Sequence, residues 1–482
     1  MRTISKALSV SALALVAAGC KLTPPPTPLD KAGDVPTTFA APVVDKQAPI
    51  WPAAEWWTNF NAPELPDLMQ AAMRGNLDLQ VAINNVLVAE TNSGIAFAGL
   101  LPTVNGSLGA RKAGTSSFDS DTFSAGLTGN YVLDFFGAKR ARLEQADQNL
   151  RGARYTQVNT GLTIQSTVAN TYFQILALRE RIAITRQNLD LARRLLGYSQ
   201  ARFAAGVTSN LDVQQEIATV AQQQSTLPNL IEQEREARYT LAVLMGQPPE
   251  NFDVKAQNLD NIAAPTVQPG APSDLLLRRP DIALAEANLY AAHANVDAAR
   301  AAYFPQISVS SGLSWGSGVL GRIFDPSSFA WNLGAALADS IFDGGVIDAT
   351  SQAAKIQQAT QIANYRKTVF TAFQQVESGV GTASAIAEQL GFIDQQVRAS
   401  VEAERISELQ YREGTIDITT LLNAQQSLFN AQLTMVNTRL TRLQNSINLY
   451  IYMGGGWEQK KSDADYKPQL TIDWFPITGP KD

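Results

Sequence analysis

The stretch that decides the fold runs from Phe123 to Gly137 and reads FSAGLTGNYVLDFFG. Up to Phe135 every odd position is apolar or glycine, and polar residues fall between them. The polar residues are Ser124, Thr128, Asn130 and Asp134. Such a period of two predicts a β-strand with two different faces. An alanine-rich stretch without proline begins directly after Gly137, so the strand leads into a helix.

The same alternation occurs in neighbouring segments and again in the second half of the chain. Residues 104–110 alternate before a loop rich in Gly, Ser and Asp, which predicts a hairpin at about 102–135. Residues 307–315 and 329–337 predict a second hairpin at about 305–342. A tilted strand of this length spans ~30 Å, the thickness of a bilayer's hydrocarbon. A hairpin of a soluble β-sandwich has the same alternation and remains an alternative on this pattern alone.

Long stretches without proline follow both hairpins. Residues 138–205 and 346–413 each predict one helix that would reach ~100 Å at ~1.5 Å per residue. Apolar and small residues recur at spacings of three and four, so these helices should pack on each other as a coiled-coil-like wall. Shorter helices are expected over residues 63–98, 211–246, 280–302 and 418–453.

The chain repeats one plan twice. At an offset of 203 Pro102 falls on Pro305, and at an offset of 208 Gly206 falls on Gly414. The predicted fold is therefore a duplicated α/β unit with four strands in two hairpins. The predicted segments are a signal peptide (1–19), an extended lipid-anchored segment (20–62), the first repeat (63–247), a linker (248–272), the second repeat (273–453) and a C-terminal tail (454–482).

Composition excludes several classes of function. The chain has 482 residues, of which 45% are apolar and 17% charged, with a formal net charge of -6. Because no long basic cluster exists, nucleic acid is not expected as a partner. One Cys and one His leave no material for a disulfide, a zinc site or a Ser/His/Asp triad. We therefore expect no catalytic residue, no metal and no cofactor other than a covalent lipid.

The amino terminus resembles the signal of a bacterial lipoprotein. Arg2 and Lys6 precede an apolar stretch, and small residues lead to Cys20. Cleavage before Cys20 would allow several acyl chains at ~0.8 kcal/mol per buried CH₂, enough for stable anchoring. Ala17 stands where lipoproteins usually have Leu. Lys21, which is not Asp, permits sorting to the outer membrane by the same resemblance.

Four membrane strands in one chain need partners. Open sheet edges in lipid leave backbone groups unpaired at several kcal/mol each, so a chain with four strands must assemble with copies of itself. Two copies would supply eight strands and three copies twelve, which leaves room for a pore. The number of copies is not fixed by spacing.

The chain resembles the outer-membrane efflux factors, the channel-tunnel family typified by TolC and OprM, and is more similar to the lipid-anchored OprM branch. The motifs behind this resemblance are Cys20, the Trp56-Trp57 opening, LDFFG (133–137), LRRPDI (277–282), IFDGG (341–345) and the segment 411–457. The resemblance implies a homotrimer with a twelve-stranded β-barrel and a twelve-helix periplasmic α-barrel. It further implies a lipid-anchored protein of the Gram-negative outer membrane that docks to a periplasmic adaptor and an inner-membrane pump, most often of the resistance-nodulation-division class.

The resemblance also assigns a periplasmic gate to the turns at Gly206 and Gly414. Its residues in this chain are Asp212, Tyr411, Ile416, Asp417, Ile418, Thr420, Leu421 and Asn423. By position, Asp212 and Tyr411 match a family Asp–Tyr hydrogen bond, although an Asp after a Thr-Ser-Asn turn also caps a helix. Ile416 stands where TolC has an Arg, and Thr420 and Asn423 stand where TolC has the acidic residues that form two rings of negative charge around the mouth. Asp417 could supply a ring of negative charge at a different position. We expect a closure more apolar than that of TolC, held by Ile416, Ile418 and Leu421.

The leading interpretation is passive conduction driven by a partner pump. One alternative is a lipid-anchored structural or adhesive coiled-coil protein of the envelope, which would use the long helices but not the two-faced hairpins. Another is an envelope hydrolase built on carboxylates, which lacks a recurring acid pair outside helix surfaces.

Overall fold

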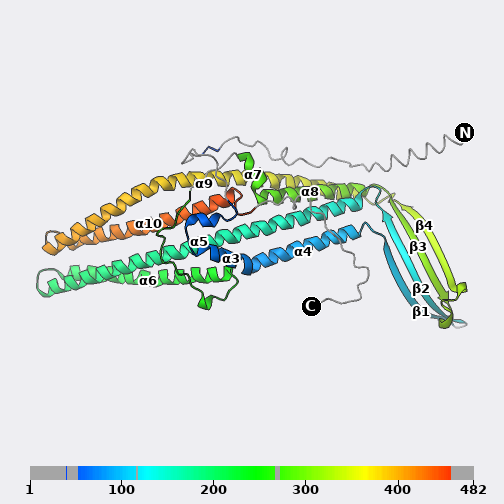
Figure 1. Ribbon diagram of the computed structural model, residues 1–482, viewed down its shortest axis with the longest axis horizontal. Helices are drawn as coiled ribbons and strands as arrows, with labels where there is room; N and C mark the ends of the chain where they lie inside the picture. The colour runs from blue at the N-terminus through cyan, green and yellow to red at the C-terminus, as the bar shows by residue number, and fades with distance from the viewer. Residues whose placement is uncertain (1–38, 41–52, 116–117, 266–271, 458–482) are drawn as a thin grey trace.

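The computed structural model describes residues 39–40, 53–115, 118–265 and 272–457. The expected signal peptide, Cys20, most of the extended segment 20–62 and the tail beyond Trp457 lie outside these residues. The helices run side by side along the long axis of the molecule, with the strands at one end and two helical turns at the other (Figure 1).

The first half has the expected order of elements, with one break that the sequence did not predict. Its elements are η1 (Trp56–Phe60), α3 (Leu65–Gly75), α4 (Leu77–Ala98), β1 (Thr103–Thr115), β2 (Phe118–Leu133), α5 (Ala138–Ala204), α6 (Asn210–Leu244) and η2 (Pro249–Asn251). The single helix expected over 63–98 is two helices, because Asn76 has an extended backbone. Its side chain accepts from the Leu79 N–H (3.0 Å) and donates to the Leu244 carbonyl (2.8 Å), which fixes the break against α6.

The second half repeats this order. Its elements are α7 (Pro272–Arg278), α8 (Pro280–Ala301), β3 (Gln306–Ser317), η3 (Leu320–Arg322), η4 (Pro326–Ser328), β4 (Phe329–Ala338), α9 (Val346–Glu413) and α10 (Ile418–Tyr452). Arg279 interrupts α7 and α8 at the position that corresponds to Asn76 at the offset of 203. Within the described ranges, none of the helices combines the length and the apolar content needed to span a membrane.

The two hairpins join into one antiparallel sheet of order β1-β2-β3-β4. The register aligns apolar positions across the strands: Leu127 pairs with Leu313, and Leu313 pairs with Trp331. Polar and small residues are aligned in the same way, as in the pair Asn130 and Ser310. One face of the sheet is therefore apolar on every strand and the other is polar or small.

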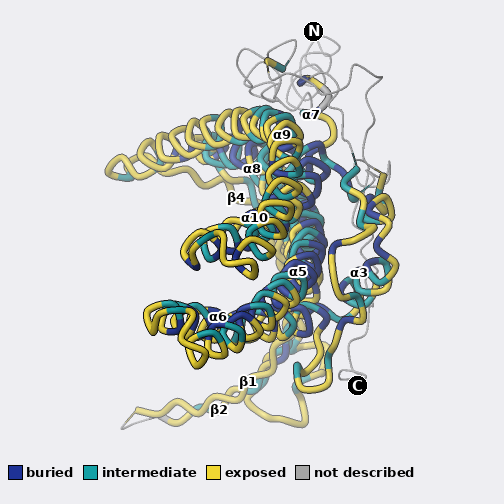
Figure 2. The backbone as a smooth tube through the Cα atoms, turned by 90° about the vertical axis from the view of Figure 1, so that its left-hand side faces the viewer, coloured by how far each residue is buried: buried dark blue, intermediate teal, exposed yellow. Residues whose placement is uncertain are grey.

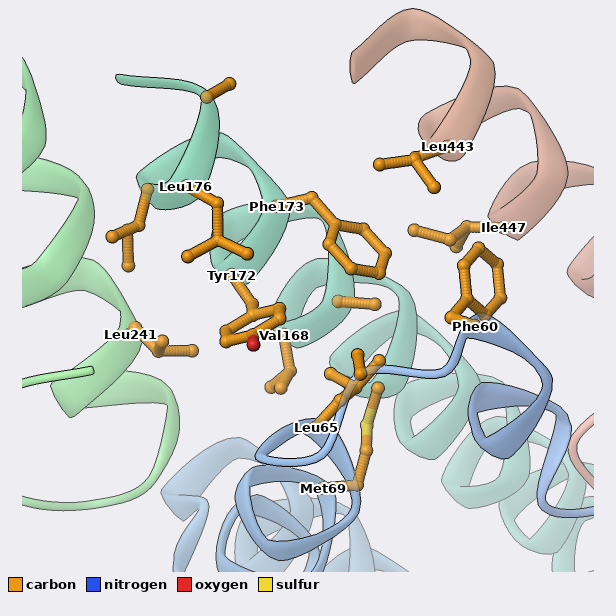
Figure 3. Packing of buried hydrophobic residues seen from close by; sticks show 14 of the residues in the cluster. Phe60, Leu65, Met69, Val168, Tyr172, Phe173, Leu176, Leu241, Leu443 and Ile447 are labelled. Atoms are coloured by element: carbon orange, nitrogen blue, oxygen red, sulfur yellow. The ribbon is translucent and has the colours of Figure 1, made fainter. Parts of the chain in front are cut away.

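The main core lies midway along the helices and not at either end. Tyr172 and Phe173 of α5, Leu65 and Met69 of α3, and Leu241 of α6 are fully buried together (Figure 3). The end of α10 closes this cluster from the other side. Buried residues gather around α5, whereas the outer turns of α6, α9 and α10 and the strands are largely exposed (Figure 2). This equatorial core holds the two halves together, and both ends of the molecule project from it.

Candidate functional site at the helical tip

The two turns that join α5 to α6 and α9 to α10 have the same geometry. Gly206 and Gly414 both have φ of 76°, a conformation that favours glycine. The Val207 N–H donates to the Arg202 carbonyl (2.9 Å), and the Thr415 N–H donates to the Gln410 carbonyl (2.9 Å). Each long helix thus ends in a Schellman-type motif, which reverses the chain within a few residues.

Asp212 belongs to the cap of α6. Ser209 is the N-cap residue and accepts from the Asp212 N–H (3.3 Å), while its hydroxyl donates to the Asp212 carboxylate (2.8 Å). Thr208 donates a further hydrogen bond to the same carboxylate. The Thr208 hydroxyl is the main cause that lowers the pKa of Asp212. The cap itself is Ser209, and Asp212 completes it as a capping box.

Tyr411 is buried in the chain and is bonded to α5. Its ring is 3% exposed, and its hydroxyl lies 3.1 Å from the Ser199 hydroxyl. The ring meets that of Tyr198 edge-on at 6.1 Å. In the described part of this chain Asp212 and Tyr411 hydrogen-bond to these other partners and not to each other, so their gate roles stay predictions.

Three residues of α5 hold the end of α9, and we call Tyr198, Ser199 and Arg202 the tip clamp. Arg202 donates to the Tyr411 carbonyl (2.9 Å), and its guanidinium lies 5.3 Å from the centre of the Tyr411 ring. Tyr198 donates to the Arg412 carbonyl (3.1 Å). A cation and a hydroxyl thereby satisfy carbonyls at the C-terminus of α9. The clamp was not predicted from the sequence, although the basic residue Arg202 in the last turn of α5 was a usable signal.

The remaining predicted gate residues divide into buried and exposed groups. Ile418 and Leu421 are 3% and 0% exposed and pack against Leu195 and Tyr411 within the chain. Ile416 is half-buried at the margin of this cluster. The exposed residues are Asp417, Thr420 and Asn423. Ile418 and Leu421 therefore brace the tip internally, and residues 416, 417, 420 and 423 are those available to a neighbouring chain.

Asp417 is the N-cap of α10. Its carboxylate accepts from the Thr420 N–H (2.8 Å) and from the Thr420 hydroxyl (2.7 Å). The hydrogen bond from the Thr420 backbone is the first cause that lowers the pKa of Asp417, so it is ionised at neutral pH. An exposed negative charge therefore stands at the start of α10.

The two helical hairpins are α5–α6 and α9–α10. On the equatorial side of their turns, a polar groove of about 230 Å³ lies between α5, α6 and α10 and separates one helical hairpin from the other. Gln223 and Gln425 line it, and both side chains are more than nine-tenths buried. The Gln223 Oε1 and Gln425 Nε2 atoms have no partner among the described protein groups. The two hairpins are therefore not sealed together here by apolar packing.

The opposite end of the molecule presents the apolar face of the sheet. Trp331 and Leu333 of β4 are each 70% exposed, and Leu108 of β1 is 86% exposed. Strands β1 and β4 are the two edges, each paired on one side within the described chain. Such a surface needs an apolar environment and further strands to pair with.

Comparisons with known proteins agree on one family. The sequence profile described as "Outer membrane efflux protein" matches residues 68–247 and 271–455. The chain is 37% identical over 469 residues to the pyoverdine export outer membrane protein OpmQ of Pseudomonas aeruginosa, covering 95% of this chain and 98% of that protein. It is 30% identical over 481 residues to the antibiotic efflux pump outer membrane protein ArpC of Pseudomonas putida, covering 96% and 98%. The open-state crystal structure of the Neisseria gonorrhoeae MtrE outer membrane channel matches with a TM-score of 0.80 and 28% identity, covering 90% of this chain and 97% of that one.

Proposed function

This chain belongs to the outer membrane efflux protein family, and from that premise we propose that it is the outer-membrane channel of a tripartite efflux system. It would conduct small molecules passively from a periplasmic adaptor and an inner-membrane pump to the outside. The energy would come from the pump, so the chain itself needs no catalytic residue or cofactor.

The four-stranded sheet is the observation that carries this proposal. An apolar face that is exposed on every strand suits lipid, and the polar and small residues of the other face suit a watery interior. The open edges of β1 and β4 require strands from other copies. Three copies would close twelve strands into a barrel with a pore, which supports a homotrimer.

The long helices extend the same conduit into the periplasm. α5 has 67 residues and α9 has 68, so each reaches ~100 Å. In a trimer the helices of three chains would continue the barrel as a hollow wall, with the tips at its periplasmic mouth. Residues 417, 420 and 423 are exposed there and residue 416 is half-buried, so these four would face neighbouring chains, which supports a mouth with one acidic position per chain.

The partners and cargo follow the family. We propose an adaptor and a pump of the resistance-nodulation-division class, with no role for nucleic acid. OpmQ is named for pyoverdine export and ArpC for antibiotic efflux, so relatives of similar sequence serve different cargoes. Cargo is therefore best identified by the drug, metal and siderophore susceptibility of a deletion strain.

Lipid anchoring at Cys20 is a further part of the proposal, supported by the lipoprotein-like amino terminus. A Cys20→Ala variant behind a cleavable, non-lipoprotein signal should lose labelled palmitate. It should keep its trimer, because the strands and not the lipid hold the chain in the membrane. Palmitate incorporation that persists in this variant would contradict Cys20 as the acceptor.

Two measurements test the channel as such. Outer-membrane extracts should give a trimer that dissociates on heating, and purified trimers should conduct ions across planar bilayers. An envelope adhesin or structural protein would do neither. The single-channel conductance of Ile416→Ala and Asp212→Ala trimers tests the gate residues. If both variants conduct as the wild type does, Ile416 and Asp212 do not belong to the gate.

A further inference from the structure

The helical hairpins α5–α6 and α9–α10 each carry an acid, buried in one and half-buried in the other, at the same distance from the turn. Glu216 lies on α6, ten residues after Gly206. Glu404 lies on α9, ten residues before Gly414. Both acids therefore occupy one level of the molecule, although they belong to opposite helices of their hairpins.

The internal repeat did not copy either acid. At the offset of 208, Glu216 corresponds to Ala424 and Glu404 corresponds to Leu196. Each hairpin thus sets one acid at this level on one helix and an apolar residue at the same level on the other. The two helical hairpins therefore share the distance of the acid from the turn, but not the helix that carries the acid.

Neither carboxyl group is fully satisfied by the protein around it. Glu216 is 0% exposed, and both of its oxygens lack a hydrogen-bond partner among the described protein groups. Glu404 is half-buried, and its buried Oε1 atom also lacks a hydrogen-bond partner among the described protein groups. Burial raises the pKa of Glu216 to about 7, and burial together with Glu408 raises the pKa of Glu404. Both groups favour the neutral form where they lie.

Charged neighbours do not compensate Glu216. Helix α5 packs along α6, and its titratable groups around this level are two exposed arginines, Arg193 and Arg194, of which Arg193 pairs with Asp190. Tyr198 and Arg202 lie nearer the tip and are engaged with the end of α9. On α6 itself Asp212 lies one turn nearer the tip in the capping box. Glu250 of η2, the other element on α6, lies at the far end of the helix. Burial is the one influence on the proton affinity of Glu216.

Glu404 is in a similar position. Residues 418–438 of α10, which pair with this part of α9, contain no charged or titratable side chain. On α9 itself Arg405 is paired with Glu402, and Arg412 with Glu408. Burial is the main influence that raises the pKa of Glu404, and the negative charge of Glu408 adds to it.

We propose that Glu216 and Glu404 form a proton-dependent latch that keeps each hairpin closed ten residues from its turn. While both are protonated, the paired helices pack together at this level. When the protons are lost, each carboxylate must reach water, and the hairpin loosens. A carboxyl group that binds its proton more tightly in the packed state stabilises that state at low pH and ceases to do so as pH rises through its raised pKa, which for Glu216 is about 7. The latch belongs to the single chain, and its consequence for the channel mouth rests on the proposed function.

Amide hydrogen exchange of the purified full-length protein in detergent tests the latch. Exchange of residues 210–224 and 404–424 would be followed from about pH 5.5 to about pH 8.5 and corrected for the intrinsic rate. In the wild type, local opening should increase by about 10- to 100-fold over this range. Glu216→Gln should abolish that increase in α6, and Glu404→Gln should abolish it in α9. Glu232 and Glu402 are acids of the same two helices that are paired with Arg235 and Arg405, and Glu232→Gln and Glu402→Gln supply matched controls that should keep the wild-type profile.

The result that overturns the latch is a wild-type profile without pH dependence, or the same pH dependence in the Gln variants. Infrared spectroscopy of the unaltered protein gives a second reading if a variant fails to fold. It should show a protonated carboxyl band at about pH 6 that is lost near pH 7, and a spectrum without this band at about pH 6 also refutes the latch. Neither reading uses conductance. A protein that passes them but conducts no ions would contradict the proposed function and leave the latch standing.

Discussion

The hydrogen bond between Ser199 and Tyr411 gives a sharp test of how the tip is held. It joins α5 to the end of α9 at 3.1 Å and is buried. The two hydroxyl groups differ in what else they can reach. A serine in a helix can bond to the carbonyl four residues earlier in its own helix, whereas the Tyr411 hydroxyl, on a ring that is 3% exposed, has no such local partner.

This difference predicts unequal costs. Ser199→Ala leaves a buried phenol without a partner and should weaken the closed tip by ~1–3 kcal/mol. Tyr411→Phe leaves a serine that turns to its own helix and should cost ~1 kcal/mol or less. The double variant removes donor and acceptor together, so it should recover most of the loss caused by Ser199→Ala.

Local opening of residues 404–424, measured by amide exchange at one pH, provides the energies, since a tenfold change corresponds to ~1.4 kcal/mol. The control is Ser427→Ala, whose hydroxyl donates to the Asn423 carbonyl of its own helix (2.7 Å) and not between hairpins. If the double variant costs the sum of the single variants, the bond does not hold the tip and the reasoning fails.

Four further predictions concern the cap of α6, the turns and the sheet. Ser209→Ala should cost ~1 kcal/mol at the start of α6, read by amide exchange there. The Thr208 hydroxyl lowers the pKa of Asp212, so the stabilisation by its carboxylate is present above the ordinary pKa of 3.8 and is lost as pH falls through the lowered pKa. Asp212→Asn should therefore loosen α6 at neutral pH and have little effect once the pH lies below that lowered pKa. Gly206→Ala and Gly414→Ala should each destabilise their turn by ~1 kcal/mol, because both glycines have φ of 76°. The two costs should be equal, since a Cβ at either position meets no close contact, and amide exchange of each turn measures them. Leu333 lies on the apolar face in the middle of β4, and Leu333→Arg should cost ~2–4 kcal/mol and lower the yield of heat-dissociable trimer. The control Asn332→Arg, on the other face, should leave the yield unchanged. Equal yields of the two variants would contradict the assignment of the faces.

The regular elements were predictable because their signals are local. A period of two and the absence of proline identify strands and long helices without knowledge of the fold. The break at Asn76 was not predictable, since it depends on the Leu244 carbonyl, 168 residues away. The pairing of β2 with β3 was missed for the same reason, because Leu127 and Leu313 belong to different repeats.

The tip shows where sequence reasoning ends. The alternative that Asp212 serves a helix cap was nearly right, since the capping box includes it and the cap itself is Ser209. Ile418 and Leu421 were expected to close the mouth, yet they are buried inside their own chain. An apolar residue after a turn reveals that it will be buried, but not whether its own chain or a neighbour covers it. Arg202 was missed because its partner is a backbone carbonyl, which leaves no trace in the sequence.

The distribution of burial along the helices decides where the molecule can move. At the equator, helices from both halves share a large apolar core around Tyr172 and Phe173. Near the tip the two helical hairpins are joined by a small apolar cluster around Leu421 and by the tip clamp. They are separated there by the groove in which Gln223 and Gln425 have amide atoms without a partner among the described protein groups. The cost of separating two elements rises with the apolar area that they bury, at ~25 cal/mol per Å². The hairpins should therefore part first at the tip and pivot on the equator, so groups that tune the tip can act without disturbing the sheet at the other end.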